Sequence, residues 1–252
     1  MNNPKTSWGK VANWYDNLLE KEDKTYQKTL ILPNLLRLLE IKRGEVILDL
    51  ACGQGFFSRE FEKLGAKVIA IDLSTELIDL AKKHNNKSIQ YHVSTADNLD
   101  FLKNNSIDKT VIILSLQNIE NVSGVLKECN SILKPNGSIL IVLNHPAFRI
   151  PKKSAWGWDD AKKIQYRRID SYLSESKEGI QMHPGNKPWE KTISFHRPLQ
   201  FYFKMLNKRG FCVSKLEEWN SNKISEEGPR KNPEDNARRE IPLFLFLQAA
   251  KS

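Results

Sequence analysis

The chain has 252 residues, a formal net charge of +9 at pH 7 and a hydrophobic fraction of 40%. This length suits one large domain or two small ones, and the hydrophobic content is ample for a buried core. No apolar run is long enough to cross a bilayer, the N-terminus lacks a signal-peptide core, and the three widely spaced cysteines form no disulfide or metal pattern. We therefore expect a cytoplasmic protein without a membrane span.

Residues 8–40 are predicted to form a helical lead before the first strand. Apolar residues recur there at helical spacing, as Leu35 and Leu39 do, and Pro33 lies near the start of the second helix.

The stretch from Val46 to Ser58 predicts a buried strand, a tight turn and the start of a helix. The apolar run ends in Asp49, and Gly53 and Gly55 follow one residue apart, so the backbone can approach a ligand closely. A dinucleotide-binding turn has a third glycine or alanine where this chain has Ser58. A carboxylate at Asp49 would repel a pyrophosphate, whereas it suits a ligand with an ammonium group, such as S-adenosylmethionine.

Strands and helices alternate along the chain from this turn onward. Buried strands are predicted over residues 67–72, 88–94, 107–116 and 138–143, and helices over 56–64, 75–85 and 123–133. Such alternation builds a parallel sheet with right-handed crossovers. A helix over 199–208 and strands over 211–219 and 241–250 follow, whereas the polar segment 220–240 is predicted to be a loop.

The pattern of Asp49, Gly53 and Gly55 resembles motif I of class I S-adenosylmethionine-dependent methyltransferases. Asp72 ends the second strand about 20 residues beyond the glycines, where a carboxylate holds ribose hydroxyls. Asp97 stands where members of the family often bind the adenine amino group. The resemblance implies S-adenosylmethionine as the cofactor and S-adenosylhomocysteine as its product.

This resemblance extends over about residues 40–145 and implies the fold. We expect a Rossmann-like, seven-stranded, mostly parallel sheet flanked by helices, with the last strand antiparallel. The chain would form a single domain, made of a helical lead, a cofactor-binding core, a substrate cap inserted after strand five and a C-terminal part that completes the core. The corresponding ranges are 1–42, 43–144, 145–192 and 193–252.

The resemblance also assigns the cofactor contacts, which follow the lead and the first four strands. They fall on Tyr15, Asp49, Ala51, Cys52, Gly53, Gly55, Phe56, Asp72, Leu73, Ala96, Asp97, Asn98, Ser115, Leu116 and Gln117. Tyr15 either reaches the methionine end of the cofactor or anchors the lead on the core. Cys52 is interpreted as a packing residue of the turn.

Aromatic residues are dense in the cap, and they suggest a lid over an aromatic or apolar acceptor. Trp156, Trp158 and Tyr166, with His196 beyond the cap, are the predicted substrate contacts. The alternative is that about half of these aromatic residues form a small core of the cap itself.

A general base is needed only if the acceptor must lose a proton. His145 directly follows strand five and is the first candidate, with His183 and His196 as alternatives. The segment after strand four, Leu116-Gln117-Asn118-Ile119, lacks the Asn/Asp-Pro-Pro-Tyr/Phe motif of enzymes that methylate amino groups on bases or glutamine. It also lacks the carboxylates of the metal-dependent catechol type, so no metal site is predicted.

Three hypotheses about function remain open. The leading one is methyl transfer to a small, aromatic or lipophilic molecule. The second is an RNA- or protein-modifying enzyme that uses a basic cap, although lysines and arginines scattered among acids are typical of an ordinary solvated surface. The third is a non-catalytic protein that binds S-adenosylmethionine. The sequence does not indicate an oligomeric state.

Overall fold

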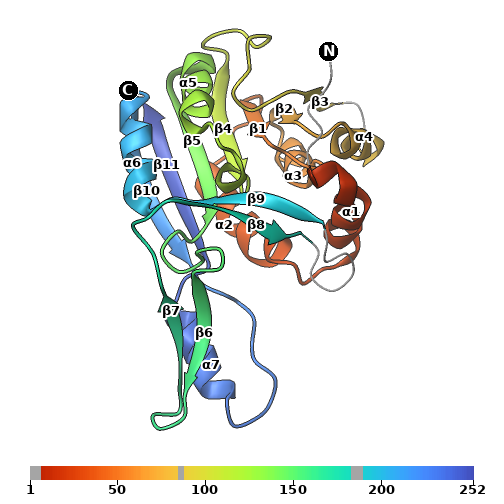
Figure 1. Ribbon diagram of the computed structural model, residues 1–252. Coiled ribbons are helices and arrows are strands. Elements are labelled where there is room, and N and C mark those ends of the chain that lie inside the picture. The colour runs from red at the N-terminus through yellow and green to blue at the C-terminus, as the bar shows by residue number, and fades with distance from the viewer. Residues whose placement is uncertain (1–6, 85–87, 183–189) are drawn as a thin grey trace.

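The computed structural model describes residues 7–84, 88–182 and 190–252, and its centre is a single seven-stranded sheet (Figure 1). The strand order is β10-β11-β5-β4-β1-β2-β3. The strands are β1 (Val46–Leu50), β2 (Lys67–Asp72), β3 (Gln90–Val93), β4 (Ile107–Ile113), β5 (Leu133–Asn144), β10 (Phe211–Trp219) and β11 (Phe244–Lys251). β1 to β5 are parallel, and β11 lies antiparallel between β5 and β10. The predicted sheet, including its inserted antiparallel strand, is confirmed.

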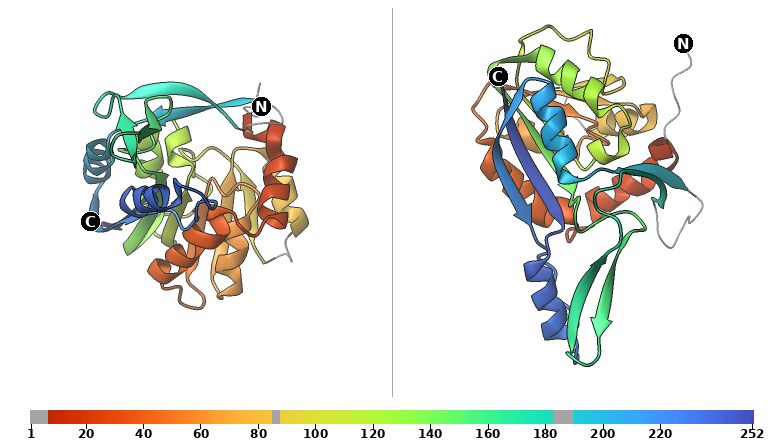
Figure 2. Two further views of the ribbon diagram at one scale, coloured as in Figure 1. Left: turned by 90° about the horizontal axis from the view of Figure 1, so that it is seen from below. Right: turned by 60° about the vertical axis from the view of Figure 1, so that its left-hand side comes forward.

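Helices cover both faces of this sheet (Figure 2). They are η1 (Ser7–Val11), α1 (Ala12–Lys21), η2 (Gln27–Ile31), α2 (Leu32–Leu39), α3 (Phe56–Lys63), α4 (Thr75–His84), η3 (Leu116–Asn118), α5 (Val122–Ile132) and α6 (Leu199–Lys208). None of the helices in the described ranges is long and apolar enough to span a bilayer.

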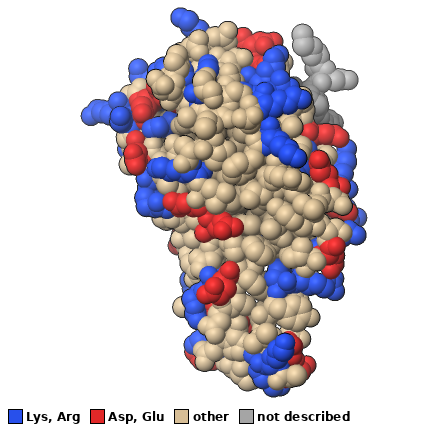
Figure 3. All heavy atoms as spheres, turned by 90° about the vertical axis from the view of Figure 1, so that its left-hand side faces the viewer, with Lys and Arg blue, Asp and Glu red and all other residues tan. Residues whose placement is uncertain are grey.

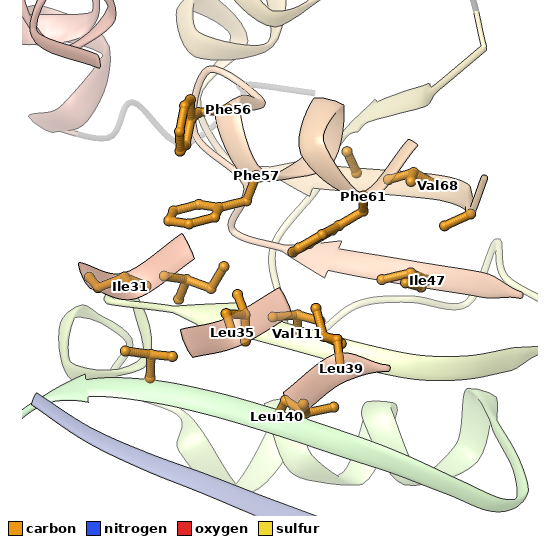
Figure 4. Close-up of a cluster of buried hydrophobic side chains, with 14 of the residues drawn as sticks. Ile31, Leu35, Leu39, Ile47, Phe56, Phe57, Phe61, Val68, Val111 and Leu140 are labelled. Carbon is orange, nitrogen blue, oxygen red and sulfur yellow. The ribbon is translucent and has the colours of Figure 1, made fainter. Parts of the chain in front are cut away.

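The central strands are apolar along most of their length because side chains on both of their faces are buried. On one face, α2 and α3 pack against the sheet, with Leu39 and Phe61 close to Ile47 and Val111 (Figure 4). On the other face, α5 and α6 bury a second cluster that includes Leu126 and Leu206. This two-sided core fixes the carboxyl ends of the parallel strands at one edge of the sheet.

The residues between β5 and α6 form two hairpins instead of further strands of the sheet. The hairpins are β6 (Ser154–Asp159) with β7 (Ile164–Ile169), and β8 (Ser176–Gln181) with β9 (Lys191–His196). β9 contacts η3 and η1, and the side-chain amide of Asn118 donates to the carbonyl of Ile193 at 2.8 Å. The β8–β9 hairpin therefore lies across the carboxyl end of β4 and reaches the N-terminal lead (Figure 1).

The β6–β7 hairpin projects away from the sheet together with a helix, α7 (Lys231–Glu240), that packs against β7 (Figures 1 and 2). The prediction of a loop over 220–240 is wrong for the half that forms α7. Pro233 is compatible with this helix because it lies in the first turn, where the N–H that a proline lacks would have no partner in any case.

Candidate functional site

The carboxyl ends of β1, β2 and β4 and the loop after β3 surround one cavity of about 550 Å³. Most of the predicted cofactor contacts line it, namely Tyr15, Asp49, Ala51, Cys52, Gly53, Asp72, Leu73, Ala96, Asp97, Ser115 and Gln117. Four others, Gly55, Phe56, Asn98 and Leu116, lie outside the lining. The fold thus gathers residues from five separate segments into one hollow, as expected for parallel strands that end at the same edge.

The turn after β1 holds several residues in the left-handed region of backbone space. The φ angles are 60° at Ala51, 59° at Gly53 and 78° at Gly55. A Cβ on Gly55 would lie 2.5 Å from the hydroxyl of Tyr91, so this glycine allows the turn to pack on the core. A Cβ on Gly53 would meet Tyr15 at an ordinary 3.4 Å, so here the backbone angle, rather than crowding, requires glycine.

Asp72 ties the end of β2 to the glycine turn. Its carboxylate accepts the backbone N–H of Gly53 at 2.9 Å and that of Ser74 at 2.8 Å. Burial nevertheless raises the pKa of Asp72, although these two hydrogen bonds act in the opposite direction. Since an ionised carboxylate has about four lone-pair sites, Asp72 can accept further hydrogen bonds from hydroxyls in the cavity.

Asp49 is 2% exposed and is the most strongly perturbed acid of the site. The pKa of Asp49 is raised to about 7, mainly by burial and in part by the nearby charge of Asp72, while the hydroxyl of Ser58 opposes this shift by donating at 2.5 Å. Ser58, which replaces the third glycine of a dinucleotide turn, therefore serves as a hydrogen-bond partner of Asp49. A cation in the cavity would stabilise the ionised form of this carboxyl.

Tyr15 brings the N-terminal lead to the same cavity. The pKa of Tyr15 is raised to about 12, mainly by burial and in part by the carboxyls of Asp72 and Asp49, so the phenol stays protonated. Its ring makes an edge contact with Trp8, which also lines the cavity. The Tyr15 hydroxyl is therefore available as a neutral hydrogen-bonding group beside two acids.

Several lining residues had no signal in the sequence. Gln27 comes from η2 and Ile180 from β8, and each reaches the cavity only because its segment folds over the sheet. Asn121 is another: its side-chain amide donates to Asp97 at 2.7 Å while its carbonyl oxygen caps α5 at the N–H of Gly124. The sequence shows that Asn121 is a type of residue that often caps helices, but it does not show that this side chain contacts Asp97.

A second, smaller cavity of about 240 Å³ adjoins the first, and the two share Gln117, Asn144 and Ile180 in their linings. His196, a predicted substrate contact, lines this second cavity and is hydrogen-bonded through Nε2 to the carbonyl of Tyr172 at 2.7 Å. The Gln117 side chain donates to the carbonyl of Leu114, and its own carbonyl oxygen is buried without a partner in the described structure.

The other three predicted substrate contacts lie on the projecting β6–β7 hairpin and line neither cavity. Trp156 packs under the guanidinium of Arg167, with 5.2 Å between the guanidinium carbon and the ring centre. Trp158 packs under Arg230 in the same way at 4.6 Å. Tyr166 lies over Gly157, which it faces across the hairpin. Two of these rings therefore pack within the hairpin, and Trp158 connects the hairpin to Arg230 at the start of α7.

His145 also lies outside both linings, although its neighbours Asn144 and Pro146 line the second cavity. The imidazole is 3% exposed; its Nε2 is hydrogen-bonded to Glu218 at 2.7 Å, and its Nδ1 accepts the N–H of Ala147 at 3.2 Å. Burial lowers the pKa of His145, and Glu218 opposes that shift. The alternative base His183 lies outside the described residues.

One group of side chains away from the cavities has the composition of a metal site. Asp16, Glu20 and His84 bring their ligand atoms within 4.8 Å of one another. However, His84 is hydrogen-bonded to Asp16 at 2.8 Å, and Glu20 is ion-paired with Arg59. These partners satisfy the polar atoms without an ion.

The sheet order, with its inserted antiparallel strand, and the glycine turn after β1 are those of the class I S-adenosylmethionine-dependent methyltransferase fold. Residues 48–141 match the model of the family described as methyltransferase domain. This region is therefore a methyltransferase domain, and S-adenosylmethionine is the cofactor of its class.

Two solved structures are similar over nearly their whole length. The S-adenosylmethionine-dependent methyltransferase from Mesorhizobium loti has a TM-score of 0.71 and 24% identity, with 91% of this chain and 99% of that chain covered. The putative S-adenosylmethionine-dependent methyltransferase from Listeria monocytogenes has a TM-score of 0.67 and 23% identity, with 86% and 97% covered. At these identities the similarity establishes the fold.

A curated relative is more similar in sequence over a shorter region. The ubiquinone biosynthesis O-methyltransferase of Xanthomonas euvesicatoria pv. vesicatoria (strain 85-10) is 32% identical over 101 residues. The match spans 39% of this chain and 42% of that protein, so it covers less than half of either.

Proposed function

We propose that this protein transfers the methyl group of S-adenosylmethionine to a small-molecule acceptor. The observation that carries the proposal is the pair of adjoining cavities, one surrounded by the glycine turn and its acids, and the other meeting it at Gln117, Asn144 and Ile180. The first has the residues for the cofactor, and the second is of a size that suits part of a small molecule.

The residues of the first cavity fit each part of S-adenosylmethionine. The buried Asp49 carboxyl suits the ammonium group, Asp72 suits the two ribose hydroxyls, and Asp97, oriented by Asn121, suits the adenine amino group. The hydroxyl of Ser115 and the carbonyl oxygen of Gln117 are buried without partners in the described structure, so they can bind polar atoms of a ligand.

S-adenosylmethionine supplies a methyl group already activated by its sulfonium. The protein then accelerates the displacement mainly by aligning the acceptor and excluding water. Ile180 of the β8–β9 hairpin lines both cavities, which supports a covering role for this hairpin over the junction where the two reactants meet. Trp8 and Tyr15 would enclose the cofactor from the side of the N-terminal lead.

A small acceptor is also favoured by the relative that acts in ubiquinone biosynthesis, whose name describes an O-methyltransferase. His145 remains the proposed base. The imidazole is hydrogen-bonded to Glu218 and lies behind the cavity lining. It would therefore act on the acceptor indirectly, through the position of Asn144 and Pro146, unless the segment moves. The predicted contacts Trp156, Trp158 and Tyr166 would act through the stability of the hairpin, and His196 through the second cavity.

The alternative of an RNA- or protein-modifying enzyme has less support. On the face drawn in Figure 3, Lys and Arg side chains lie among Asp and Glu side chains instead of forming a continuous basic patch. Two exposed basic residues of the cap are paired with acids, namely Lys152 with Glu178 and Arg168 with Asp170. The third hypothesis, cofactor binding without turnover, is separated from the proposal by the transfer assay below.

The test begins with calorimetry of the purified protein against S-adenosylmethionine, S-adenosylhomocysteine and NAD. We expect micromolar binding of the first two and no binding of NAD; binding of NAD alone would reject the cofactor site. S-adenosylmethionine with an isotope-labelled methyl group is then incubated with the protein and a small-metabolite extract or total RNA. Label in a small molecule supports the proposal, label in RNA supports the alternative, and label in neither supports binding without turnover.

A further inference from the structure

The second cavity contains an unusual set of cations. We propose that the acceptor carries an anionic oxygen group, a carboxylate or a phosphate ester, that is bound by Arg149, Arg167 and Arg197. This proposal rests on the proposed methyl transfer. All three arginines line this cavity, and they come from the turn after β5, from β7 and from the residue after β9.

Arg197 is the most deeply buried of the three, with only 5% of the residue exposed. Its Nη2 donates to the carbonyl of Glu120 at 2.9 Å, and its guanidinium packs over the rings of Phe195 and Phe201. Its Nη1, however, is buried without a hydrogen-bond partner in the described structure. A buried guanidinium with an unused donor is costly unless a ligand supplies an acceptor.

Arg149 and Arg167 bring two more positive charges to the same cavity. Burial lowers the pKa of both, and the charge of Arg149 lowers the pKa of Arg167 further, which indicates that the two guanidiniums lie close together. Arg167 donates to the carbonyl of Phe148 at 2.7 Å and to the hydroxyl of Ser154 at 2.8 Å, so neutral oxygens fix its position.

The described part of the chain provides no ion-pair partner for these three arginines. Among the described residues, none of the three guanidiniums forms an ion pair with a carboxylate, whereas Arg168, next to Arg167 on β7, is paired with Asp170 at 3.0 Å. Three arginines that line one cavity without an ion-pair partner among the described residues suit an anionic oxygen group, since guanidinium groups match carboxylate and phosphate geometry.

The cavity also orients such a molecule toward the cofactor. Its border with the first cavity is formed by Gln117, Asn144 and Ile180, and apolar residues such as Ile150 and Phe195 line its sides. An acceptor whose anionic end is held by the arginines would extend its other end along these apolar walls to the shared border. The arginines would thereby set which atom of the acceptor meets the methyl group.

The experiment uses protein saturated with S-adenosylhomocysteine and three probes that differ in one group: benzoate, benzamide and phenyl phosphate. Calorimetry or saturation-transfer NMR measures their binding. We expect benzoate or phenyl phosphate to bind at least tenfold more tightly than neutral benzamide, and the tighter of the two names the anionic group. Equal binding of all three probes, or no binding of any, would overturn the proposal.

Variants test whether these arginines are responsible. Arg149→Gln, Arg167→Gln and Arg197→Gln should each weaken binding of the preferred probe at least tenfold. Arg168→Gln is the matched control, because it removes the same charge from the same strand outside the cavity and should change binding less than twofold. An equal loss in the control, or unchanged binding in all three cavity variants, would contradict the assignment.

Binding of S-adenosylhomocysteine and the melting temperature are measured for every variant. Arg197→Gln is the variant with the greatest risk of misfolding, because its side chain is buried. If it misfolds, Arg149→Gln and Arg167→Gln decide the test. If the wild-type protein fails to bind S-adenosylhomocysteine, the proposed function fails. If it binds that compound but shows no preference for anionic probes, only the arginine site fails.

Discussion

The two cavities differ in how they are built. Apart from the N-terminal residues Trp8, Tyr15 and Gln27 and the border residues Asn144 and Ile180, the first cavity is lined by residues 49–121, at the ends of successive strands. Apart from Gln117, the second is lined by residues 144–202, which belong to the end of β5, the turn after it, the two hairpins of the cap and α6. The comparison teaches that the proposed cofactor site follows from the strand-turn-helix units of the sheet, whereas the proposed acceptor site depends on how the cap folds over the sheet.

The largest effect is expected at the glycine turn of the first cavity. Gly53→Val should abolish measurable binding of S-adenosylmethionine, because a β-branched residue at a φ of 59° costs about 1–3 kcal/mol and moves the turn. Calorimetry checks the affinity and circular dichroism the fold. Gly44→Val is the control, since it places the same residue at a φ of 86° in a turn with no atom within 4 Å of the new Cβ. Normal cofactor binding by Gly53→Val would show that the turn does not carry the site.

The next effect is expected at Asp72. Asp72→Ala should weaken S-adenosylmethionine binding by roughly 1.5–3 kcal/mol, which is roughly 10- to 150-fold, because it removes the ribose acceptor. The same change leaves the N–H groups of Gly53 and Ser74 without their partner. Asp100→Ala, at an exposed position outside the cavity lining, is the matched control. Unchanged affinity in calorimetry would reject the role of Asp72.

A smaller effect, on pH dependence, is expected at Asp49. Because burial raises its pKa to about 7, the carboxyl is mostly protonated at pH 6 and mostly ionised at pH 8. Only the ionised form attracts an ammonium group, so affinity for S-adenosylmethionine should rise about tenfold between these pH values. Asp49→Asn should remove this dependence and bind weakly at both pH values.

The same ionisation has the opposite effect on the stability of the free protein. The folded state keeps the Asp49 proton over a range, from about its ordinary pKa of 3.8 up to about 7, in which the unfolded state loses it. This carboxyl therefore contributes less to stability as pH rises through that range. Asp49→Asn should raise the melting temperature at pH 8 relative to the wild type, and a lower melting temperature would contradict the assigned burial.

The smallest effect is expected at the boundary of the acceptor cavity. His145→Ala should reduce turnover on the acceptor without changing cofactor affinity, by less than the roughly 100-fold expected of a base in direct contact with the acceptor, because the imidazole lies behind the cavity lining. Glu218→Gln, which keeps a hydrogen-bonding partner for the imidazole but removes its charge, separates two roles. If His145 is the base, the pH profile of turnover should shift to lower pH in that variant, because Glu218 raises the pKa of the imidazole, whereas a positioning residue would change only the KM of the acceptor. Full activity of His145→Ala excludes both roles.

The fold was predictable where the hydrophobic pattern was strong. The strands Lys67–Asp72 and Phe211–Trp219 and the helix Leu199–Lys208 were predicted with the bounds that they have. Helix α7 was missed, because its residues are almost entirely polar and it is held by packing against the β6–β7 hairpin instead of by an apolar face of its own.

The predicted substrate contacts also show how far the sequence alone allows the site to be predicted. Tryptophan and tyrosine suggested an acceptor lid, but Trp156 and Trp158 are used by the hairpin as surfaces for Arg167 and Arg230. Aromatic side chains serve packing and ligand binding equally well, so their number alone does not distinguish the two uses.

The sequence by itself determined the sheet, the glycine turn and the acids of the cofactor site, because each of these depends on the order and spacing of residues in a strand-turn-helix unit. Tertiary structure alone decided that Gln27, Ile180 and the three arginines belong to the cavities. The reason is physical: successive parallel strands must end at the same edge, which places their loop residues together, whereas the path of the cap depends on long-range packing and leaves no periodic trace in the chain.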